Sequence, residues 1–255
     1  MNQIKVHIVG TGNVAWHMAK AIVKSNAQIT GISSQNAENA ESFAAISKAP
    51  VKDIENSIDA DVILLCIPDH AIASVALKLN NTDALVCHTS GATSLEALHP
   101  IKKQGVIWPI QSLKKDIPTE YEHLAIAIEA NSQANLEVVK SLTSFSDQVR
   151  ILTHDQRLML HLAAVFTNNF TNHMIAIAQD ICKEHHLDFD LLRPLLKETY
   201  IKLETTTALD AQTGPAIRKD SNTIEKQKSL LKNHPLYKEI YTVISASIQK
   251  HNKEH

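Results

Sequence analysis

The sequence of 255 residues predicts an α/β fold in which a doubly wound, mostly parallel sheet is followed by an all-helical C-terminal domain. Three observations support this prediction. A glycine-rich turn follows the first apolar segment, short apolar segments then alternate with amphipathic ones, and only helical patterns remain after Thr153. We therefore expect one domain over residues 1–152 and a second over residues 153–255.

The first apolar segment, residues 5–9, ends in a Gly-x-Gly-x-x-Ala turn and is followed at once by an amphipathic helix. Gly10 allows the tight turn, Gly12 lets a pyrophosphate approach the backbone, and Ala15 lets helix and strand pack closely. The phosphates would lie at the N-terminus of the helix, where free N–H groups and the dipole favour an anion. These features predict a Rossmann dinucleotide site. Its cofactor contacts are expected at Gly10, Thr11, Gly12, Asn13 and Val14.

The next strand, residues 28–33, indicates which dinucleotide binds. It ends in Ser33-Ser34-Gln35-Asn36, where NAD-binding proteins carry a carboxylate for the ribose 2′-hydroxyl. Small hydroxyl and amide groups do not repel a 2′-phosphate, so NADP is favoured over NAD, with Ser33 and Ser34 as contacts. The alternative is that Ser34 or Asn36 only caps the following helix.

Two nearly continuous apolar segments, Asp61–Ile67 and Ala84–Cys87, are typical of parallel strands that are buried on both faces. Ligands of such sheets bind at the carboxyl ends of the strands. We therefore expect Ile67, Pro68 and His88 beside the cofactor, with Asp69 capping the next helix. His88 is also a candidate catalytic residue; its alternative is a structural role as the cap of the turn that follows it.

The remaining segments complete the two domains. Thr93–Glu96 fits a capping box that opens a helix ending at Gly105, and Thr153–Gln156 fits a second box that opens a helix of about 30 residues. The other expected strands are 106–107, 124–129 and 149–152, and the other expected helices are 134–145, 191–203, 222–231 and 235–250.

The long helix carries polar residues on an otherwise apolar surface. At 100° per residue, His154, His161, Asn168 and Asn172 share one side. This line is either a solvent-exposed seam or the wall of a site. In the second case His161 is the candidate proton donor, because imidazole titrates near neutrality, and Asn168 orients the substrate.

Three further residues are candidate substrate contacts. They are Gln111 after a strand end, Asn172 on the long helix, and Arg218, whose guanidinium could hold a carboxylate or phosphate. Asp220, in the same loop as Arg218, is expected to cap the next helix.

Composition excludes several classes of protein. The net charge is −2 and no run of Lys or Arg stands out, which argues against nucleic-acid and membrane-surface binding. We expect no signal peptide and no membrane-spanning segment. No histidine or cysteine spacing suits a metal, and Cys66 and Cys87 fit the core of a reduced, cytoplasmic protein.

Taken together, the motifs resemble a family of Rossmann-like proteins assigned as NADP oxidoreductases, which carry a helical C-terminal domain of unknown function. The resemblance spans nearly the whole chain. It rests on Gly10–Ala15, Ile67–Asp69, His88–Gly91, Pro109–Ser112, His161–Phe166 and Thr213–Pro215. More distantly, the chain is similar to the pyrroline-5-carboxylate reductase, 6-phosphogluconate dehydrogenase and β-hydroxyacid dehydrogenase superfamily. That similarity implies a cofactor in a cleft between the domains and a homodimer built through the helical domain.

One departure from these relatives concerns the reaction. β-Hydroxyacid dehydrogenases carry Lys-x-x-Asn-Asn on the long helix, and alignment on Asn168-Asn169 places Val165 at the lysine position. Valine cannot donate a proton, so we expect His161, one turn earlier, to take that role. The sequence therefore predicts a reductase that transfers hydride between NADPH and a small carbonyl or imine. The alternative is an NADP-binding sensor or regulatory protein that has lost the catalytic acid.

Overall fold

The computed structural model describes residues 3–54, 58–79 and 81–254. Contacts divide the chain into two compact units, Met1–Asn169 and Phe170–His255, and each is described here by itself. The division by contacts falls inside the long helix, whereas the sequence pattern changes at Thr153; the expected boundary at 152/153 stays a prediction.

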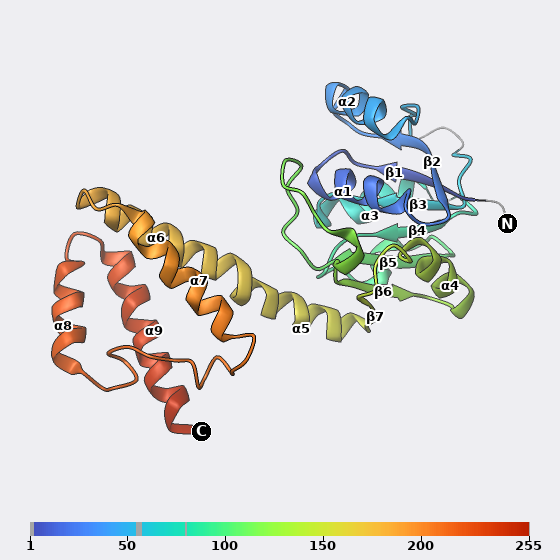
Figure 1. The fold of residues 1–255 in the computed structure, drawn as a ribbon. Coiled ribbons are helices and arrows are strands. Elements are labelled where there is room, and N and C mark those ends of the chain that lie inside the picture. Colours follow the sequence, from blue (N-terminus) through green and yellow to red (C-terminus); the bar gives the residue numbers. More distant parts are fainter. Residues whose placement is uncertain (1–2, 55–57, 80, 255) are drawn as a thin grey trace. The chain divides into compact units, whose positions relative to one another are not determined.

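A seven-stranded sheet forms the centre of the first unit and appears in Figure 1 as a ladder from β2 to β7. Neighbouring strands are parallel except for β5 and β6, which are antiparallel. The predicted α/β fold with a mostly parallel sheet is therefore confirmed. In spatial order the strands are β2 (Ala27–Ser33), β1 (Ile4–Val9), β3 (Val62–Leu65), β4 (Leu85–His88), β5 (Gln104–Pro109), β6 (Ile126–Ala130) and β7 (Val149–Ile151).

One isolated β-bridge lies at the outer edge of β2. Val51 forms a single parallel bridge with Ile32, and the N–H of Lys52 donates to the Ile32 carbonyl over 2.8 Å. If this bridge is counted as the third strand, the order is the 3-2-1-4-5-6 arrangement of dinucleotide-binding sheets. The connection changes direction between β1 and β3, and sheets of this order bind their ligands outside the carboxyl ends of the two strands at that point.

Helices cover both faces of the sheet. One face packs against α1 (Asn13–Ile22), α2 (Ala37–Ser47) and α4 (Gln133–Leu142), and the other against α3 (Asp69–Lys78). The strands alternate accordingly: in β3, Val62 and Leu64 join the first core, and Ile63 and Leu65 the second. All four side chains are fully buried, as their apolar run predicts.

The long helix begins where the sequence predicts. The Thr153 side chain accepts from the N–H of Gln156 and the Gln156 side chain accepts from the N–H of Thr153, which completes the capping box. The helix continues through α5 (His154–Ala164), a π-helical segment (Val165–Phe170) and α6 (Thr171–Glu184). A π-helix has more residues per turn than an α-helix, so the constant 100° used to align the polar residues does not hold beyond Val165.

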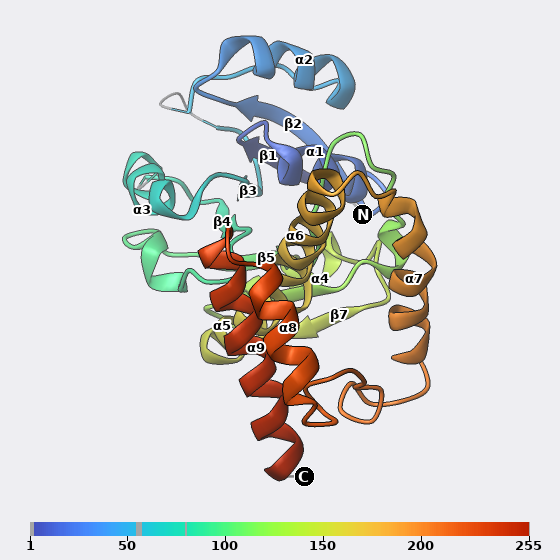
Figure 2. The same ribbon diagram turned by 90° about the vertical axis from the view of Figure 1, so that its left-hand side faces the viewer.

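The second unit is all-helical, as the sequence predicts. The α6 helix is followed by α7 (Arg193–Lys202), α8 (Ser221–Leu230) and α9 (Pro235–Glu254), and α8 lies beside α9 in Figures 1 and 2. Two side-chain pairs join α9 and its start to α6: Tyr237 donates to Asp180 over 2.8 Å, and His234 lies 2.6 Å from Glu184. No helix of the described residues is long and apolar enough to cross a membrane.

One predicted helix is wrong. Leu95–Leu98 forms a single 3₁₀ turn with no side-chain cap, in place of the helix expected from the Thr93–Glu96 motif. Pro100 follows closely and has no N–H to continue a helix. Gly105, expected to end that helix, lies inside β5.

Candidate active site

The glycine turn between β1 and α1 has the geometry that a dinucleotide requires. Gly10 has φ +107°, and a Cβ at this position would lie 2.2 Å from the Cys66 carbonyl oxygen, so only glycine fits. Gly12 has the opposite surroundings, because a Cβ there would meet no atom within 4 Å. No described residue accepts a hydrogen bond from the N–H groups of Asn13 and Val14, and the N-cap Gly12 has no side chain to do so. These open donors fit a pyrophosphate.

Ser33 and Ser34, both expected as cofactor contacts at the end of β2, differ in burial and in hydrogen-bond partners. Ser33 is 4% exposed and its hydroxyl donates to the Lys52 carbonyl over 2.7 Å, and its role as a cofactor contact stays a prediction. Ser34 is partly exposed, and its hydroxyl lies 3.1 Å from that of Thr11 in the glycine turn. Asn36 accepts from a backbone N–H of α2 and caps that helix. The pair of Thr11 and Ser34 is therefore the polar group nearest the expected ribose.

A buried histidine that the sequence did not single out supports this edge. His7 is fully buried on β1, and its Nε2 lies 2.8 Å from the Ser33 oxygen. Because the Ser33 hydrogen is already donated to a carbonyl, the His7 Nε2–H is the donor in this contact. Burial, and then the nearby charge of Lys52, lowers the pKa of His7 to about 4, so its ring is neutral.

The turn after β3 lies beside the glycine turn, as expected. The Ile67 side chain is 3.2 Å from the position of a Cβ on Gly10, and Pro68 is exposed at the N-cap of α3. Asp69 is the first residue of α3 and its side chain makes no cap, so the expected capping role is wrong. Proline holds its own φ and starts the helix without a side-chain hydrogen bond.

His88, expected as a catalytic and cofactor-binding residue, accepts a hydrogen bond from the turn that follows it. It is fully buried, and its Nδ1 accepts from the N–H of Ser90 over 3.2 Å. Burial, and after it the charge of Arg157, lowers the pKa of His88 to about 4. The hydrogen bond from Ser90 and the full burial of the ring fit the structural alternative, a cap of the turn, while the catalytic and cofactor-binding roles of His88 stay predictions.

The turn after His88 is held by a residue that the sequence analysis missed. The Arg157 side chain, on the first turn of α5, is fully buried. Its guanidinium donates to the carbonyls of Ser90 (3.2 Å), Gly91 (3.1 Å) and Thr93 (2.7 Å) and to the Glu129 carboxylate (2.7 Å). We call these four contacts the Arg157 clamp. It ties α5 and β6 to the carboxyl end of β4.

His161 follows the Arg157 clamp by one helical turn and reaches the same place. Its ring centroid is 5.6 Å from that of Trp108 on β5. A Cβ at Gly91 would be 2.7 Å from His161 Cδ2 and 2.6 Å from Trp108 Cε2. The half-buried His161 is thus brought to the turn after β4, at the edge of the sheet that also carries the glycine turn.

The other predicted site residues are less constrained. Asn168 is exposed in the π-helical segment and Gln111 is exposed after β5, both in the first unit. Asn172 and Arg218 are exposed in the second unit, and their roles as substrate contacts stay predictions. Asp220 accepts from the N–H of Thr223 and caps α8, as expected.

The segment after β5 that contains Lys114, Lys115 and Tyr121 is hydrogen-bonded to α1, a contact that the sequence analysis did not predict. The Asn13 side chain accepts from the N–H of Lys115 over 3.2 Å. His17, one turn later, donates through Nε2 to the Lys114 carbonyl and accepts from the Tyr121 hydroxyl through Nδ1. The expected cofactor contact Asn13 therefore uses its side-chain oxygen within the protein, which leaves its backbone N–H and its side-chain NH2 group as donors for a phosphate.

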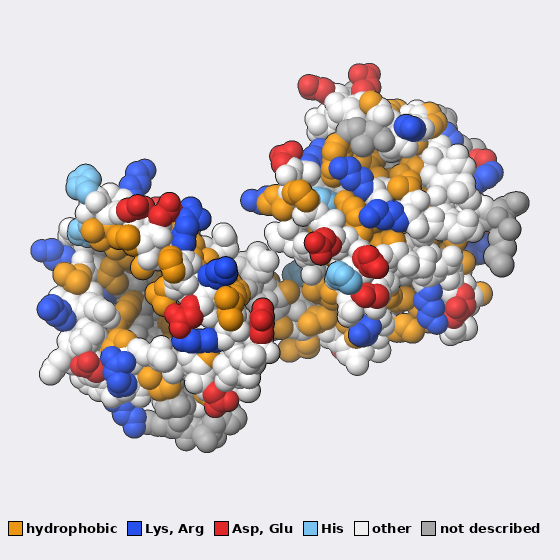
Figure 3. Space-filling model, in the orientation of Figure 1, with side chains coloured by type: hydrophobic (Ala, Val, Ile, Leu, Met, Phe, Trp, Pro, Cys, Tyr) orange, Lys and Arg blue, Asp and Glu red, His pale blue; other side chains and the backbone are white. Residues whose placement is uncertain are grey.

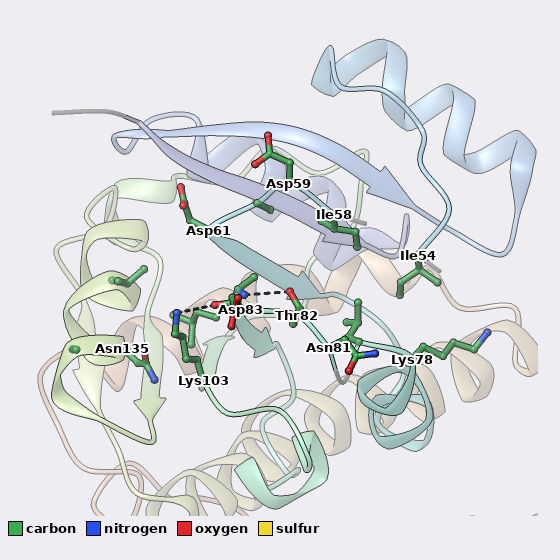
Figure 4. A pocket seen from close by; sticks show the side chains of 16 residues that line it. Ile54, Ile58, Asp59, Asp61, Lys78, Asn81, Thr82, Asp83, Lys103 and Asn135 are labelled. Atoms are coloured by element: carbon green, nitrogen blue, oxygen red, sulfur yellow. Dashed lines mark hydrogen bonds between the residues drawn. The ribbon is translucent and has the colours of Figure 1, made fainter. Parts of the chain in front are cut away.

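A large cavity of the first unit lies at the opposite edge of the sheet (Figure 4). It has a volume of about 960 Å³ and is bordered by Asp61 before β3, Ala84 before β4 and Lys103 before β5. These are the amino ends of the strands, so this cavity is not the dinucleotide crevice. Lys103 donates to the Asp83 carbonyl there over 2.7 Å. Nowhere in the described ranges do three His, Cys, Asp or Glu side chains gather as metal ligands.

Comparison with known proteins agrees with this architecture. Residues 1–111 match the Rossmann-like domain, and residues 124–248 match a domain of unknown function, DUF2520. The crystal structure of a "putative NADP oxidoreductase" from Bacteroides fragilis is 31% identical, covers 98% of this chain and 99% of that chain, and has a TM-score of 0.90. The chain therefore belongs to the family in which a Rossmann-like domain is followed by DUF2520, as the resemblance in sequence indicates.

Two more distant structures share the fold. A protein from Thermotoga maritima is 21% identical, covers 98% of each chain and has a TM-score of 0.74. A 1-pyrroline-5-carboxylate reductase from Streptococcus pyogenes is 15% identical, covers 98% of this chain and 100% of that chain, and has a TM-score of 0.66. A search of curated proteins gives no match.

Proposed function

We propose that the protein is an oxidoreductase that transfers a hydride between NADPH and a small carbonyl or imine substrate. The position of His161 carries this proposal. Its half-buried imidazole lies against Trp108 and Gly91, at the edge of the sheet where the open N–H groups of the glycine turn fit a dinucleotide. NADPH would supply the hydride, and the residues of the chain bind, orient and protonate.

The choice of NADP over NAD rests on the end of β2. Thr11 and Ser34 present hydroxyl groups there, and residues 33–36 include no carboxylate that would repel a 2′-phosphate. The 31% identical protein from Bacteroides fragilis, named as an NADP oxidoreductase, supports the same choice.

In this proposal His161 is the proton donor. It lies one turn before Val165, the residue that stands where β-hydroxyacid dehydrogenases carry lysine, and an imidazole can supply the proton that valine cannot. Asn168 would orient the substrate, with Gln111, Asn172 and Arg218 as further contacts. The named substrate of the Streptococcus pyogenes reductase, a cyclic imine with a carboxylate, is one suitable class.

Thermal shift with NADPH, NADP, NADH and NAD tests the cofactor. A nucleotide present at about 100 times its Kd should stabilise the protein by about 2.7 kcal/mol. We expect the largest shift with NADPH or NADP. If none of the four nucleotides raises Tm, the proposal of a dinucleotide site is wrong.

Hydride transfer is then measured as NADPH oxidation with small oxo acids and cyclic imines. We expect His161→Ala to reduce turnover by about 100-fold or more, the usual contribution of a general acid, while the shift with NADPH persists. His185→Ala, at the exposed end of α6, is the matched control and should leave turnover unchanged. Equal turnover in wild type and His161→Ala would remove His161 from the mechanism.

A second candidate function is an NADP-binding sensor or regulatory protein. Val165 favours it, because the lysine of the dehydrogenases is absent. This alternative predicts a thermal shift with NADPH but no hydride transfer to any of the substrates above.

We also propose that two copies associate through the helical unit. Large apolar side chains are exposed there, including Leu191 (76%), Leu230 (71%) and Val243 (62%), and Figure 3 shows hydrophobic groups on its surface. Where such side chains form a contiguous patch, the patch is an interaction site, which is the basis of this proposal. Analytical ultracentrifugation should give a dimer mass, and Leu191→Glu with Val243→Glu should shift it toward the monomer. A cytoplasmic location completes the proposal and fits three buried, free cysteines.

A further inference from the structure

Burying the charged guanidinium of Arg157 in the clamp costs free energy, which indicates a role for this residue beyond filling space in the core. Arginine is almost never fully buried unless it is paired, and here the only charged partner in the clamp is Glu129. The remaining three contacts go to backbone carbonyls within four residues of the turn after β4. An apolar side chain could fill the same space in the core, but it could not bind the three carbonyls. We therefore infer that the guanidinium fixes the conformation of this turn.

The clamp also determines where one backbone donor points. The C=O and N–H of a planar trans peptide point in opposite directions. Since the Ser90 carbonyl faces Arg157, the N–H of Gly91 in the same peptide unit points away from the guanidinium. Gly91 is buried, yet its N–H meets no acceptor among the described residues. Buried N–H groups without an acceptor are rare, which indicates that a ligand completes this one.

The unpaired donor lies next to His161. The position of a Cβ on Gly91 is 2.7 Å from the imidazole Cδ2, so ring and backbone are in contact. The Trp108 ring lies against the same Cβ position, which is 2.6 Å from its Cε2, and against the imidazole, with ring centroids 5.6 Å apart. Two hydrogen-bond donors of different kinds, a backbone N–H and an imidazole, therefore share one apolar wall.

We propose that Arg157 is a positioning residue that holds the Gly91 N–H and the His161 imidazole together as a donor pair for the substrate atom that gains charge. This inference rests on the proposed reductase function. In the reduction, hydride from NADPH forms the new C–H bond and the π pair of C=O or C=N moves to oxygen or nitrogen. That atom takes a proton from the His161 imidazolium, while the Gly91 N–H donates a hydrogen bond to it. NADPH leaves as NADP⁺, and solvent returns the proton to His161.

Lysine cannot replace arginine in this role. In Arg157, Nη1 donates to the three carbonyls and Nη2 to the Glu129 carboxylate, so the rigid guanidinium plane fixes the carbonyls and the carboxylate relative to each other. An ammonium group has three donors on one atom and would keep the charge but lose the fork. Arg157→Lys therefore keeps the positive charge in the core and removes the contacts that fix the conformation of the turn.

The experiment uses the six glycines and two tryptophans of the chain. ¹⁵N-glycine labelling gives a peak for the Gly91 N–H, and Trp16→Phe leaves Trp108 as the only indole. In this background we compare Arg157→Lys and Arg157→Met with Arg150→Lys, an exposed arginine on β7 that serves as control. The readouts are the Gly91 peak and Trp108 emission without nucleotide, then the Kd for NADPH and kcat.

Both Arg157 variants should shift the Gly91 peak and Trp108 emission while the Gly105 peak stays in place. We expect the Kd for NADPH to change less than about threefold and kcat to fall by at least about 30-fold, with Arg150→Lys unchanged. Unmoved Gly91 and Trp108 signals, or a Kd that worsens in parallel with kcat, would overturn the proposal. If Arg157→Met does not fold, Glu129→Gln takes its place and must shift the same peak. If the wild type binds no NADPH, the proposed function fails, while the nucleotide-free signals still decide the role of Arg157.

Discussion

The imidazole of His161 lies against the indole of Trp108, with ring centroids 5.6 Å apart and planes inclined by 56°. The first residue belongs to α5 and the second to β5, so this contact joins the long helix to the sheet. Gly91 lies against both rings, because a Cβ on this residue would stand 2.6 Å from Trp108 and 2.7 Å from His161. The space at Gly91 is therefore shared by the proposed proton donor, His161, and by the indole that packs against it.

Gly91→Ala should disturb this contact directly. The added Cβ would stand 2.6 Å from Trp108 and 2.7 Å from His161, closer than real contacts allow. Overpacking of this kind costs about 1–3 kcal/mol, which urea unfolding can measure. We expect a changed Trp108 emission in a Trp16→Phe background and a lower kcat. A variant with wild-type stability and emission would show that the turn yields without moving either ring.

The two glycines of the dinucleotide turn should fail in different ways. Gly10→Ala places a side chain at positive φ against the Cys66 carbonyl, so it should lose about 1–3 kcal/mol of stability from strain, and more from the clash. Gly12→Ala meets no atom of the protein, so Tm should stay near that of the wild type while the Kd for NADPH rises about tenfold or more. Thermal melts with and without NADPH measure both. A Gly12→Ala protein with unchanged affinity would mean that the phosphates do not approach this backbone.

Ser34→Asp should change the preference between the two nicotinamide nucleotides. The hydroxyl of Ser34 is paired with that of Thr11, and a carboxylate at this position would repel a 2′-phosphate and accept a bond from a 2′-hydroxyl. We expect the ratio of the NADPH Kd to the NADH Kd to rise about tenfold or more, measured by fluorescence titration. Ser74→Asp, exposed on α3, carries the same charge away from the site and should leave the ratio unchanged. Equal effects of the two substitutions would contradict a ribose site at Ser34.

Stability should fall as the pH drops through the weakly acidic range. The pKa of His88 is lowered by burial from 6.5 to about 4, so below pH 6.5 the unfolded chain takes up a proton that the folded protein does not. Stability is therefore full above about pH 6.5 and decreases by about 1.4 kcal/mol per pH unit for this group, to a loss of about 3 kcal/mol near pH 4. His7 acts in the same direction.

His88→Asn isolates this contribution. The amide oxygen of asparagine can accept from the Ser90 N–H as the imidazole does, but it takes up no proton. Urea unfolding at several pH values between 4.5 and 7 should show a shallower slope for the variant, with His7 accounting for what remains. The same slope in both proteins would mean that His88 is protonated in the folded state.

The sequence was sufficient for the features that local chemistry dictates. Continuous apolar segments identified the buried strands β3 and β4, and the glycine spacing identified the turn before α1. The Thr153 capping box located the start of α5. Each of these signals lies within a few residues, and the interactions that form the corresponding element involve those same residues.

The clamp and the buried caps depend on contacts between distant segments. Arg157 is charged and lies on an amphipathic helix, so its local pattern predicts a solvent-exposed side chain. Its partners Ser90, Gly91 and Thr93 lie 64 to 67 residues away, and only the folded sheet brings their carbonyls to one point. The role of His88 could not be predicted from the sequence either, because a histidine at the end of a strand suits both a catalytic residue and a cap.

The π-helical segment at Val165–Phe170 affects how relatives of this protein can be compared. An extra residue within a turn rotates every later side chain relative to those before it. A motif such as Lys-x-x-Asn-Asn then keeps its spacing in the chain but not its direction in space. For His161 and Asn168, the number of residues between them no longer gives the angle between them. Equivalent residues in this family therefore have to be matched turn by turn on superposed helices, not column by column in an alignment.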